Sequence, residues 1–197
     1  MKQDIILSGV GGQGILSIAT IIGWAALDQN LHLKQAEVHG MSQRGGEVQS
    51  NLRLSNNIIF SDLIPRGNCD LIISLEPMEA LRYLPWLSGQ GWIITNTSPF
   101  VNIPNYPDVE IVKTELEKVG RVIMIDVNTI AGNLKSPRST NMVLLGAAAP
   151  FIKILEPKNL IDGIRNTFAA KGEKVTETNV DAFKAGCDFA QKHLKNN

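Results

Sequence analysis

A glycine-rich turn between a short apolar run and an amphipathic stretch is the feature that most constrains this sequence. The apolar run is residues 5–7, and Gly9, Gly11 and Gly14 follow it with the spacing GxGxxG. Apolar residues then recur three and four apart over residues 15–27. A short apolar run bounded by glycine is typical of a strand buried on both faces of a parallel sheet. The later spacing is typical of a helix with one broad apolar face, so we predict a strand, a tight loop and a helix in succession.

The predicted loop suits an anionic ligand. In this motif the first glycine permits the tight turn, the second lets the backbone approach a pyrophosphate, and the third lets the helix pack on the strand. The helix N-terminus adds partial positive charge. Gly12 makes this loop more permissive and Gln13 adds a neutral amide donor, so the anion need not be a dinucleotide pyrophosphate. The alternative is that the glycines serve only the close packing of helix on sheet.

Further strands and helices extend this unit into an α/β domain. Residues 31–33 are predicted as a second parallel strand that completes a βαβ unit. Residues 48–55 alternate between the two faces of a strand, Asn56-Asn57 suits a turn, and 58–60 would be the second strand of an inserted antiparallel hairpin. Residues 71–75, 92–95 and 122–125 are predicted as buried strands, and Glu76-Pro77 opens a helix.

The last third of the chain is predicted to be helical, over residues 140–155, 157–170 and 178–193. Gly172 would end the second of these helices, and Thr178 or Asn179 would cap the third. No linker-like stretch interrupts the chain. We expect a single domain, residues 1–197, with a mostly parallel, Rossmann-like sheet, an inserted antiparallel hairpin and a helical C-terminal third.

A second glycine-rich stretch, residues 39–46, lies at the predicted carboxyl edge of the sheet, where open α/β sheets place their ligands. Arg44 could clamp a carboxylate or phosphate with two hydrogen bonds, and the amides of Gly45 and Gly46 could form an anion-binding nest. The alternative is a flexible lead-in to the hairpin. The candidate ligand-binding residues of the two stretches are Gly9, Gly11, Gly12, Gln13, Gly14, Ser42, Gln43, Arg44, Gly45 and Gly46.

A free-standing nucleotide- or flavin-binding protein, or a dehydrogenase, would use the first loop differently. An acidic residue about 20 positions on would then bind the ribose, and Glu37 is the candidate. The alternative is that Glu37 is a solvated residue at a strand end. A dehydrogenase also needs a catalytic group, and His39 has no identifiable partner. A third possibility is a scaffold whose glycine loops bind nothing. We assign no catalytic residue.

Charge and cysteine content exclude several classes of function. Lys and Arg number 19, as do Asp and Glu, so no excess charge exists to attract nucleic acid or an acidic membrane. Cys69 and Cys187 are predicted to be buried free thiols, too few for an iron–sulfur cluster, which takes four thiolates. The apolar run 15–27 falls short of the roughly 20 residues of a membrane span. With no signal-like start, the chain is expected in the cytoplasm.

Three segments carry a resemblance to a known family. GVGGQG at 9–14, EVHGMSQRGG at 37–46 and NMVLLGA at 141–147 resemble the gamma-type subunit of 2-oxoacid:ferredoxin oxidoreductases, and the resemblance runs nearly end to end. Within that family, GVGGQG followed by HGMSQRGG is most similar to the small subunits of the indolepyruvate type.

The resemblance implies a heteromeric oxidoreductase that decarboxylates an aryl-pyruvate, joins the acyl group to coenzyme A and passes electrons to ferredoxin. It places thiamine diphosphate and the iron–sulfur clusters on a large alpha subunit, the expected partner of this chain. The chain itself would hold no metal and no redox centre. Its two glycine loops would help to hold coenzyme A phosphates or close over the active centre.

Overall fold

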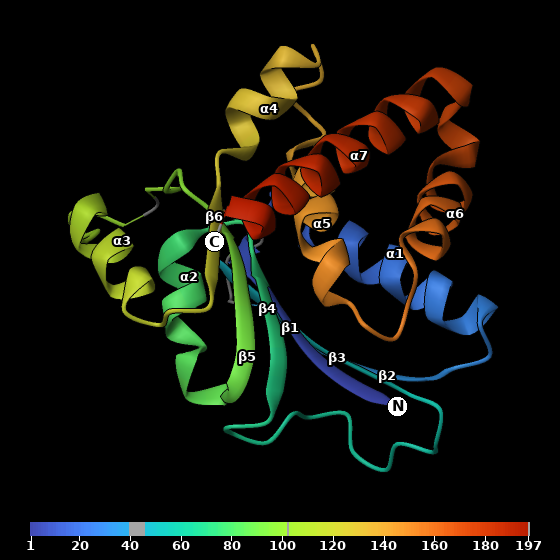
Figure 1. Cartoon of the computed structure of the whole chain (residues 1–197), viewed down its shortest axis with the longest axis horizontal. Helices are drawn as coiled ribbons and strands as arrows, with labels where there is room; N and C mark the ends of the chain where they lie inside the picture. The colour runs from blue at the N-terminus through green and yellow to red at the C-terminus, as the bar shows by residue number, and fades with distance from the viewer. Residues whose placement is uncertain (40–45, 102, 197) are drawn as a thin grey trace.

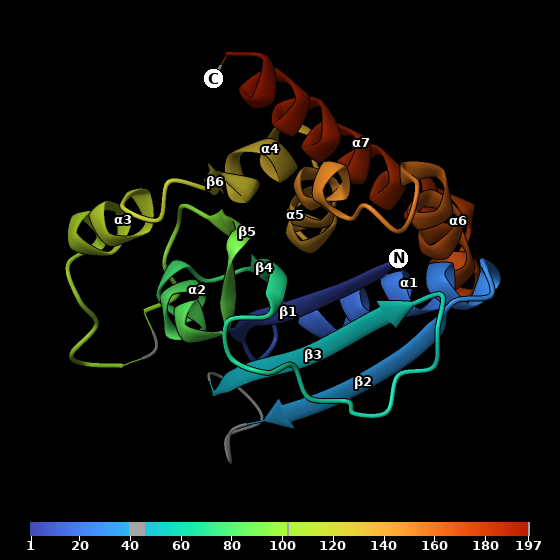
Figure 2. The same cartoon turned by 60° about the horizontal axis from the view of Figure 1, so that its bottom comes forward.

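The described part of the chain is built on a six-stranded sheet. The structure is a computed structural model that describes residues 1–39, 46–101 and 103–196. The strands lie in the order β2-β3-β1-β4-β5-β6, and β1, β4, β5 and β6 are mutually parallel while β3 is antiparallel to both its neighbours. Their bounds are β1 Lys2–Val10, β2 His32–His39, β3 Glu47–Ser55, β4 Cys69–Ser74, β5 Leu87–Asn96 and β6 Val122–Ile125. The predicted mostly parallel sheet with an antiparallel hairpin at one edge is confirmed (Figure 2).

Helices cover both faces of the sheet (Figure 1). The α-helices are α1 Ile15–Asp28, α2 Pro77–Arg82, α3 Val109–Glu117, α4 Val127–Asn133, α5 Thr140–Ala148, α6 Pro157–Phe168 and α7 Glu173–Asn196. Three short 3-10 turns are η1 Leu84–Trp86, η2 Ala149–Phe151 and η3 Ala169–Lys171. Helices α1, α5, α6 and α7 pack on one face, and α2 and α3 pack on the other. The helical C-terminal third is thereby confirmed.

The alternation of side chains along β1 explains this three-layer arrangement. Ile5 and Leu7 belong to the core on the α1 face, whereas Ile6 belongs to the core on the α2 face. All three side chains are fully buried. Successive side chains of a strand point to opposite faces, so a continuous apolar run requires a covering layer on each side. The predicted central strand is therefore confirmed.

The predicted βαβ unit is corrected in one respect. The strand after α1 runs from His32 to His39, and β3 lies between it and β1. β2 is thus an edge strand that runs in the same direction as β1 without pairing with it. The single-sequence pattern missed this because β2 is polar at most positions, as suits an edge strand with one solvated face.

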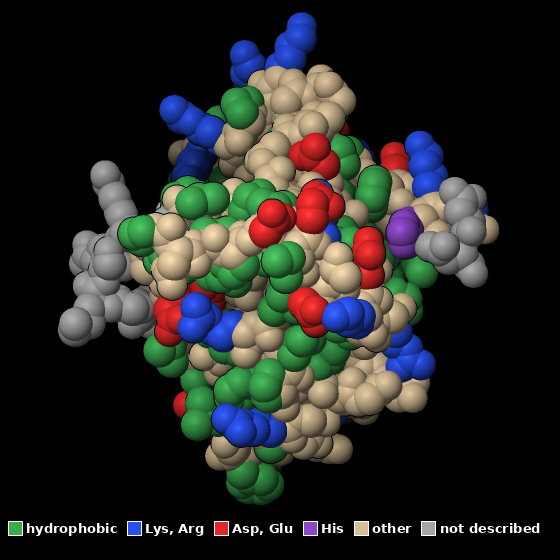
Figure 3. All heavy atoms as spheres, turned by 90° about the vertical axis from the view of Figure 1, so that its left-hand side faces the viewer, with side chains coloured by type: hydrophobic (Ala, Val, Ile, Leu, Met, Phe, Trp, Pro, Cys, Tyr) green, Lys and Arg blue, Asp and Glu red, His purple; other side chains and the backbone are tan. Residues whose placement is uncertain are grey.

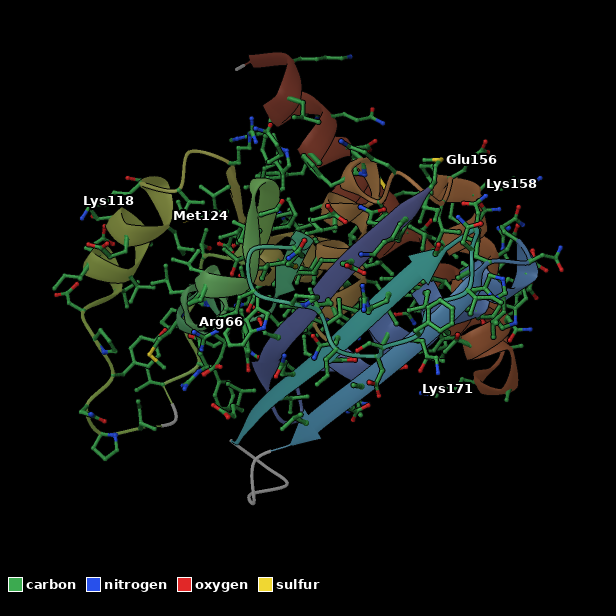
Figure 4. The ribbon with its side chains drawn as sticks, turned by 90° about the horizontal axis from the view of Figure 1, so that it is seen from below. Arg66, Lys118, Met124, Glu156, Lys158 and Lys171 are labelled. Atoms are coloured by element: carbon green, nitrogen blue, oxygen red, sulfur yellow. The ribbon has the colours of Figure 1, made fainter. Side chains whose placement is uncertain are left out.

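The predicted hairpin is present with a different partner strand. β3 pairs with β2, and residues 58–60 form no strand. β3 is hydrogen-bonded along its length to β1 on one side and to β2 on the other, so β3 has no free edge with which residues 58–60 could pair. The segment instead covers the sheet: the Arg53 guanidinium donates to the carbonyl oxygens of Ser61 and Leu63 at 2.9 and 3.0 Å. Further along, Arg66 lies over the ring of Trp86, 5.0 Å from its centroid (Figure 4).

Two predicted helix boundaries move. The helix that begins at Thr140 ends at Ala148, because Pro150 follows and the chain tightens into η2. Gly172 ends the next helical segment as predicted, with φ +89°. The predicted caps Thr178 and Asn179 are wrong, since α7 already begins at Glu173. Their side chains bond back to the carbonyls of Lys174 and Val175 inside the helix.

Candidate anion-binding site

The first glycine loop takes the conformation that its sequence predicts. Gly12 and Gly14 have φ values of +100° and +88°, in the left-handed region that favours glycine. Gly14 is the N-cap of α1, and a Cβ there would lie 2.5 Å from Nδ2 of Asn141. A Cβ on Gly9 would lie 2.8 Å from Oε1 of Gln13. Glycine is thus required at 9 and 14 by close approach.

Gln13 braces the loop from within. Its Oε1 accepts the Val10 N–H at 2.7 Å, and its Nε2 donates to the Leu75 carbonyl at 3.3 Å. The side chain therefore ties the loop to the ends of both β1 and β4. Both ends of the amide bond to the main chain, so the main effect of Gln13 is to fix the loop's position.

The two glycine-rich stretches meet. The Gly11 N–H donates to the Gly46 carbonyl oxygen at 2.9 Å, next to the start of β3. Ser42, Gln43, Arg44 and Gly45 lie outside the described residues. The strands β1 and β2 end, and β3 begins, at the same edge of the sheet. The sequence prediction that both stretches lie at this edge is confirmed for the parts that the structure describes.

A cleft of about 540 Å³, here called the edge cleft, opens at the carboxyl ends of the parallel strands. It is bounded by the glycine loop, by the segments that follow β4 and β5, and by the starts of α4 and α5. Its lining residues are Gly12, Gln13, Leu75, Asn96, Ser98, Pro99, Phe100, Val127, Asn128, Pro137, Arg138 and Thr140. Arg138 is the charged side chain among them, and no carboxylate lines the cleft within the described parts of the chain.

Helix ends add to the positive charge of the edge cleft. In the described structure neither Gly14 nor Ser139, the N-cap residues of α1 and α5, caps its helix with a side chain. Helix α5 begins at the cleft with Thr140, and the cleft-lining Gly12 and Gln13 come shortly before α1. The hydroxyl of Ser139, the N-cap residue of α5, bonds to that of Ser136 at 2.7 Å instead. Unsatisfied N–H groups carry partial positive charge. α4 differs, because Asp126 caps it by accepting the Thr129 N–H and hydroxyl, and these bonds lower the pKa of Asp126.

Glu76 holds one wall of the edge cleft in place. Its carboxylate is fully buried and caps α2 by accepting the Glu79 N–H at 2.8 Å. It also accepts the Phe100 N–H at 3.3 Å and the Tyr106 hydroxyl, which fasten the segment after β5. Burial and the bond to Glu76 raise the pKa of Tyr106. The sequence marked Glu76 only as a helix start, because the partners that it binds are 24 and 30 residues away.

Arg138 is the site residue that the sequence analysis missed. It lies in a Ser-Pro-Arg-Ser segment directly before α5, which is ordinary composition for a loop and a helix cap. Its placement at the cleft follows from the docking of α5 against the glycine loop, where Nδ2 of Asn141 donates to the Gly14 carbonyl at 3.2 Å. One sequence signal could have identified Arg138: an arginine directly before a predicted helix, in a chain that also contains a glycine loop before another helix.

Glu37 is not brought to the glycine loop. It lies within β2, and β3 separates that strand from β1. Its carboxylate accepts a hydrogen bond from Gln35 at 3.4 Å. His39 is the last residue of β2 and pairs in register with Val48.

The cysteines do not suit a cluster site. Cys69 is buried, its thiol donates to the Leu71 carbonyl at 3.2 Å, and burial raises its pKa to about 12. Cys187 is half-buried, and burial raises its pKa to about 11. Both are free thiols, as predicted. Over residues 1–39, 46–101 and 103–196, no three His, Cys, Asp or Glu side chains gather where they could hold a metal ion.

No helix in the described part of the chain combines the length and apolar character that crossing a membrane requires.

Comparison with known proteins identifies the family. The family model described as pyruvate ferredoxin/flavodoxin oxidoreductase matches residues 4–189. The chain belongs to this family. The expected resemblance, drawn from three short segments, thus extends over almost the whole sequence.

Relatives within the family are similar over their full length. The chain is 37% identical to indolepyruvate oxidoreductase subunit IorB of Methanothermobacter thermautotrophicus, over 94% of this chain and 96% of that protein. It is 34% identical to the protein of the same name from Pyrococcus horikoshii, over 98% and 99% respectively. The prediction of an indolepyruvate-type small subunit agrees with both names.

Solved structures of other members share the fold. The gamma subunit of a keto/oxoacid ferredoxin oxidoreductase from Geobacter sulfurreducens superposes with a TM-score of 0.71 at 19% identity, over 98% of each chain. A 2-oxoglutarate:ferredoxin oxidoreductase from Magnetococcus marinus, solved with 2-oxoglutarate, coenzyme A and succinyl-CoA, gives 0.76 at 22% identity. The match covers 97% of this chain and 31% of that longer one.

Proposed function

We propose that this chain, as a single domain of residues 1–197, is the small subunit of a cytoplasmic 2-oxoacid:ferredoxin oxidoreductase that acts on indolepyruvate or a related aryl-pyruvate. The names and the full-length similarity of its relatives support this assignment. Its partner would be a large alpha subunit that carries thiamine diphosphate and the iron–sulfur clusters and passes electrons to ferredoxin. The presence of only two cysteines, both free thiols, and the lack of a metal-binding group among the described residues do not fit a cluster on this chain.

The contribution of this chain would be to bind coenzyme A at the edge cleft. The observation that carries this proposal is one cleft that combines Arg138, the start of α5 and two residues of the glycine loop, Gly12 and Gln13, with no acidic residue among its described lining. A phosphate group there would accept hydrogen bonds from loop amides and from Arg138. Coenzyme A, when bound, supplies the thiol that accepts the acyl group.

The described residues would divide this work. Gly12 lets the backbone come close to the ligand, since no atom lies within 4 Å of the place its Cβ would take. Arg138 and the Thr140 hydroxyl would bind phosphate oxygens, and Gln13 would keep the loop in position. Glu76 holds the opposite wall, residues 98–100, by its bond to the Phe100 N–H.

The second glycine stretch would add to the same site. The Gly46 carbonyl accepts the Gly11 N–H, so the last residue of the second stretch lies beside the first loop. We propose that Arg44 binds an anionic group of the ligand and that the amides of Gly45 and Gly46 assist it.

A free-standing nucleotide- or flavin-binding protein is the second candidate. The glycine loop would serve it equally well. The position of Glu37 in an edge strand, with β3 between it and β1, counts against a ribose contact at that loop.

The test uses the chain co-purified with its large partner and follows indolepyruvate-dependent dye reduction with and without coenzyme A. Activity that is undiminished when this chain is left out would overturn the subunit assignment. We expect Arg138→Ala to raise the KM for coenzyme A about tenfold, the effect of one charge-assisted hydrogen bond. Arg121→Ala is the matched control, because Arg121 does not line the edge cleft and its guanidinium donates to the Gly89 carbonyl.

The same assay tests the second stretch through Arg44→Ala. We expect a raised KM for coenzyme A with an intact complex. If assembly and coenzyme A dependence both stay unchanged, Arg44 has no part in the site.

A further inference from the structure

A second cleft of about 510 Å³, here called the helical cleft, lies among the first turn of α1, the start of α5, the end of α6 and the start of α7. Arg138 lines this cleft as well as the edge cleft. Neither glycine-rich stretch lines it within the described residues. Figure 1 shows α7 crossing α5, with α6 packed between α7 and α1.

The helical cleft concentrates positive charge. Arg138, Lys171 and Lys174 line it, and no acidic residue does in the described structure. None of the three forms an ion pair with a carboxylate of residues 1–39, 46–101 or 103–196. The nearby acid Glu177 is paired with Arg165 at 3.1 Å. On the face that carries α3, by contrast, Lys and Arg side chains lie among Asp and Glu side chains (Figure 3).

The two lysines lie close to the start of α7, where positive charge is unfavourable without a nearby anion. Lys171 is the last residue of η3, two positions before the first residue of α7, and Lys174 is the second residue of α7. A helix N-terminus carries partial positive charge, so cations there are repelled unless an anion is nearby. Glu173, the first residue of α7, offers one such charge without lining the cleft. Two lysines at this end of a helix, with no carboxylate partner among the described residues, therefore favour a bound anion.

The helical cleft also has apolar and hydroxyl surfaces. Phe168 and Val175 line it, with 8% and 40% of their surface exposed. Nζ of Lys171 lies 5.1 Å from the centroid of the Phe168 ring, and Figure 4 marks Lys171 at the junction of α6 and α7. Ser17 and the buried Ser139 supply hydroxyls. Apolar side chains beside cations and hydroxyls suit a ligand with one flat apolar part and one anionic part.

We propose that the helical cleft binds a nucleoside phosphate. The phosphate groups contact Lys171, Lys174 and Arg138, and the base packs on Phe168 and Val175. The ligand is either a free nucleotide or the nucleotide end of coenzyme A, whose base, ribose and phosphates share this chemistry. The proposal concerns binding by this chain alone, so it stands or falls apart from the activity of the assembled enzyme.

The test is calorimetric titration of the full chain with 3′,5′-ADP, with 5′-ADP and with inorganic phosphate at low ionic strength. We expect saturable binding of nucleotide that weakens as salt is added, because screening reduces attraction between exposed charges. The double variant K171A/K174A should bind at least about tenfold more weakly, since hydrogen bonds between charged groups are lost. Lys192→Ala should bind as the native chain does, because Lys192 lies on α7 away from the cleft.

Two results would overturn the proposal, and the preference between the two nucleotides identifies the ligand. Equal affinity in the native chain and the double variant, with circular dichroism showing both folded, overturns the proposal. So does inorganic phosphate binding as tightly as either nucleotide, because the apolar surface would then contribute nothing. Preference for 3′,5′-ADP assigns the cleft to coenzyme A, and equal binding of the two nucleotides assigns it to a free nucleotide. An Arg138→Ala enzyme with an unchanged KM for coenzyme A would contradict the proposed function while leaving this titration intact.

Discussion

Replacing Gly14 with alanine tests how the glycine loop and α5 depend on each other. Gly14 has φ +88° and ψ +26°, and an L residue in this left-handed region costs about 1–2 kcal/mol. The new Cβ would also lie 2.5 Å from Nδ2 of Asn141, so the Asn141 side chain must move. Moving it breaks its 3.2 Å hydrogen bond to the Gly14 carbonyl, a further loss of about 1 kcal/mol.

Gly12→Ala isolates the second contribution. Gly12 has φ +100°, but no atom lies within 4 Å of the position its Cβ would occupy. Both variants place alanine at a positive φ, where an L side chain is strained, and both carry the effect of alanine on the unfolded chain. We expect the free energy of unfolding of Gly14→Ala to be about 1 kcal/mol below that of Gly12→Ala, measured by urea denaturation with unchanged m-values.

The Asn141→Ala background completes the test as a double-mutant cycle. With the amide removed, Gly14→Ala should lose only the backbone part, and the two glycine variants should become equally stable. If Gly14→Ala and Gly12→Ala are equally stable with Asn141 present, the contact between the glycine loop and α5 contributes nothing measurable, and the reasoning from Gly14 to Arg138 fails.

Three other predictions concern the frame around the site. Glu76→Ala removes a buried helix cap and the acceptor for two hydrogen bonds from the segment after β5. We expect the free energy of unfolding, measured by urea denaturation, to fall by about 3 kcal/mol and proteolysis of that segment to become faster. Unchanged proteolysis would contradict the role of Glu76 in holding the wall of the edge cleft. Gly146→Ala places a methyl group against the Phe183 carbonyl, where α5 meets α7. Thermal denaturation should show that the free energy of unfolding falls by about 1–3 kcal/mol. The control is Gly132→Ala in α4, whose methyl group would meet no neighbouring atom and should leave stability nearly unchanged. The pKa of Asp126 is lowered by the hydrogen bonds that its carboxylate accepts. Its contribution to the free energy of unfolding is therefore present above the ordinary carboxyl pKa and disappears as pH falls through the folded-state pKa. Between about pH 5 and pH 3 the native protein should lose more stability than Asp126→Asn does, and parallel stability curves for the two proteins would refute this.

Local sequence patterns determined the elements whose signals are short-range. The strand, glycine loop and helix at residues 2–28 follow from apolar spacing and from glycines at positions that need a left-handed backbone or close contact. The start of α2 follows from Glu76 and Pro77, and the end of η3 from Gly172. Each of these features depends on neighbours within a few residues, which is why periodicity and turn chemistry reveal it.

Tertiary structure alone decided where strands pair and which side chains meet. Residues 58–60 have strand-like composition, but both edges of β3 are already occupied, so they form a covering segment. Arg138 lines the same cleft as the glycine loop only because α5 docks on that loop, from more than 120 residues along the chain. Glu76 holds one wall of the edge cleft through hydrogen bonds from Phe100 and Tyr106, which lie on a segment distant in the sequence. Strand order and helix docking depend on burial across the whole sheet, a property that no local window contains.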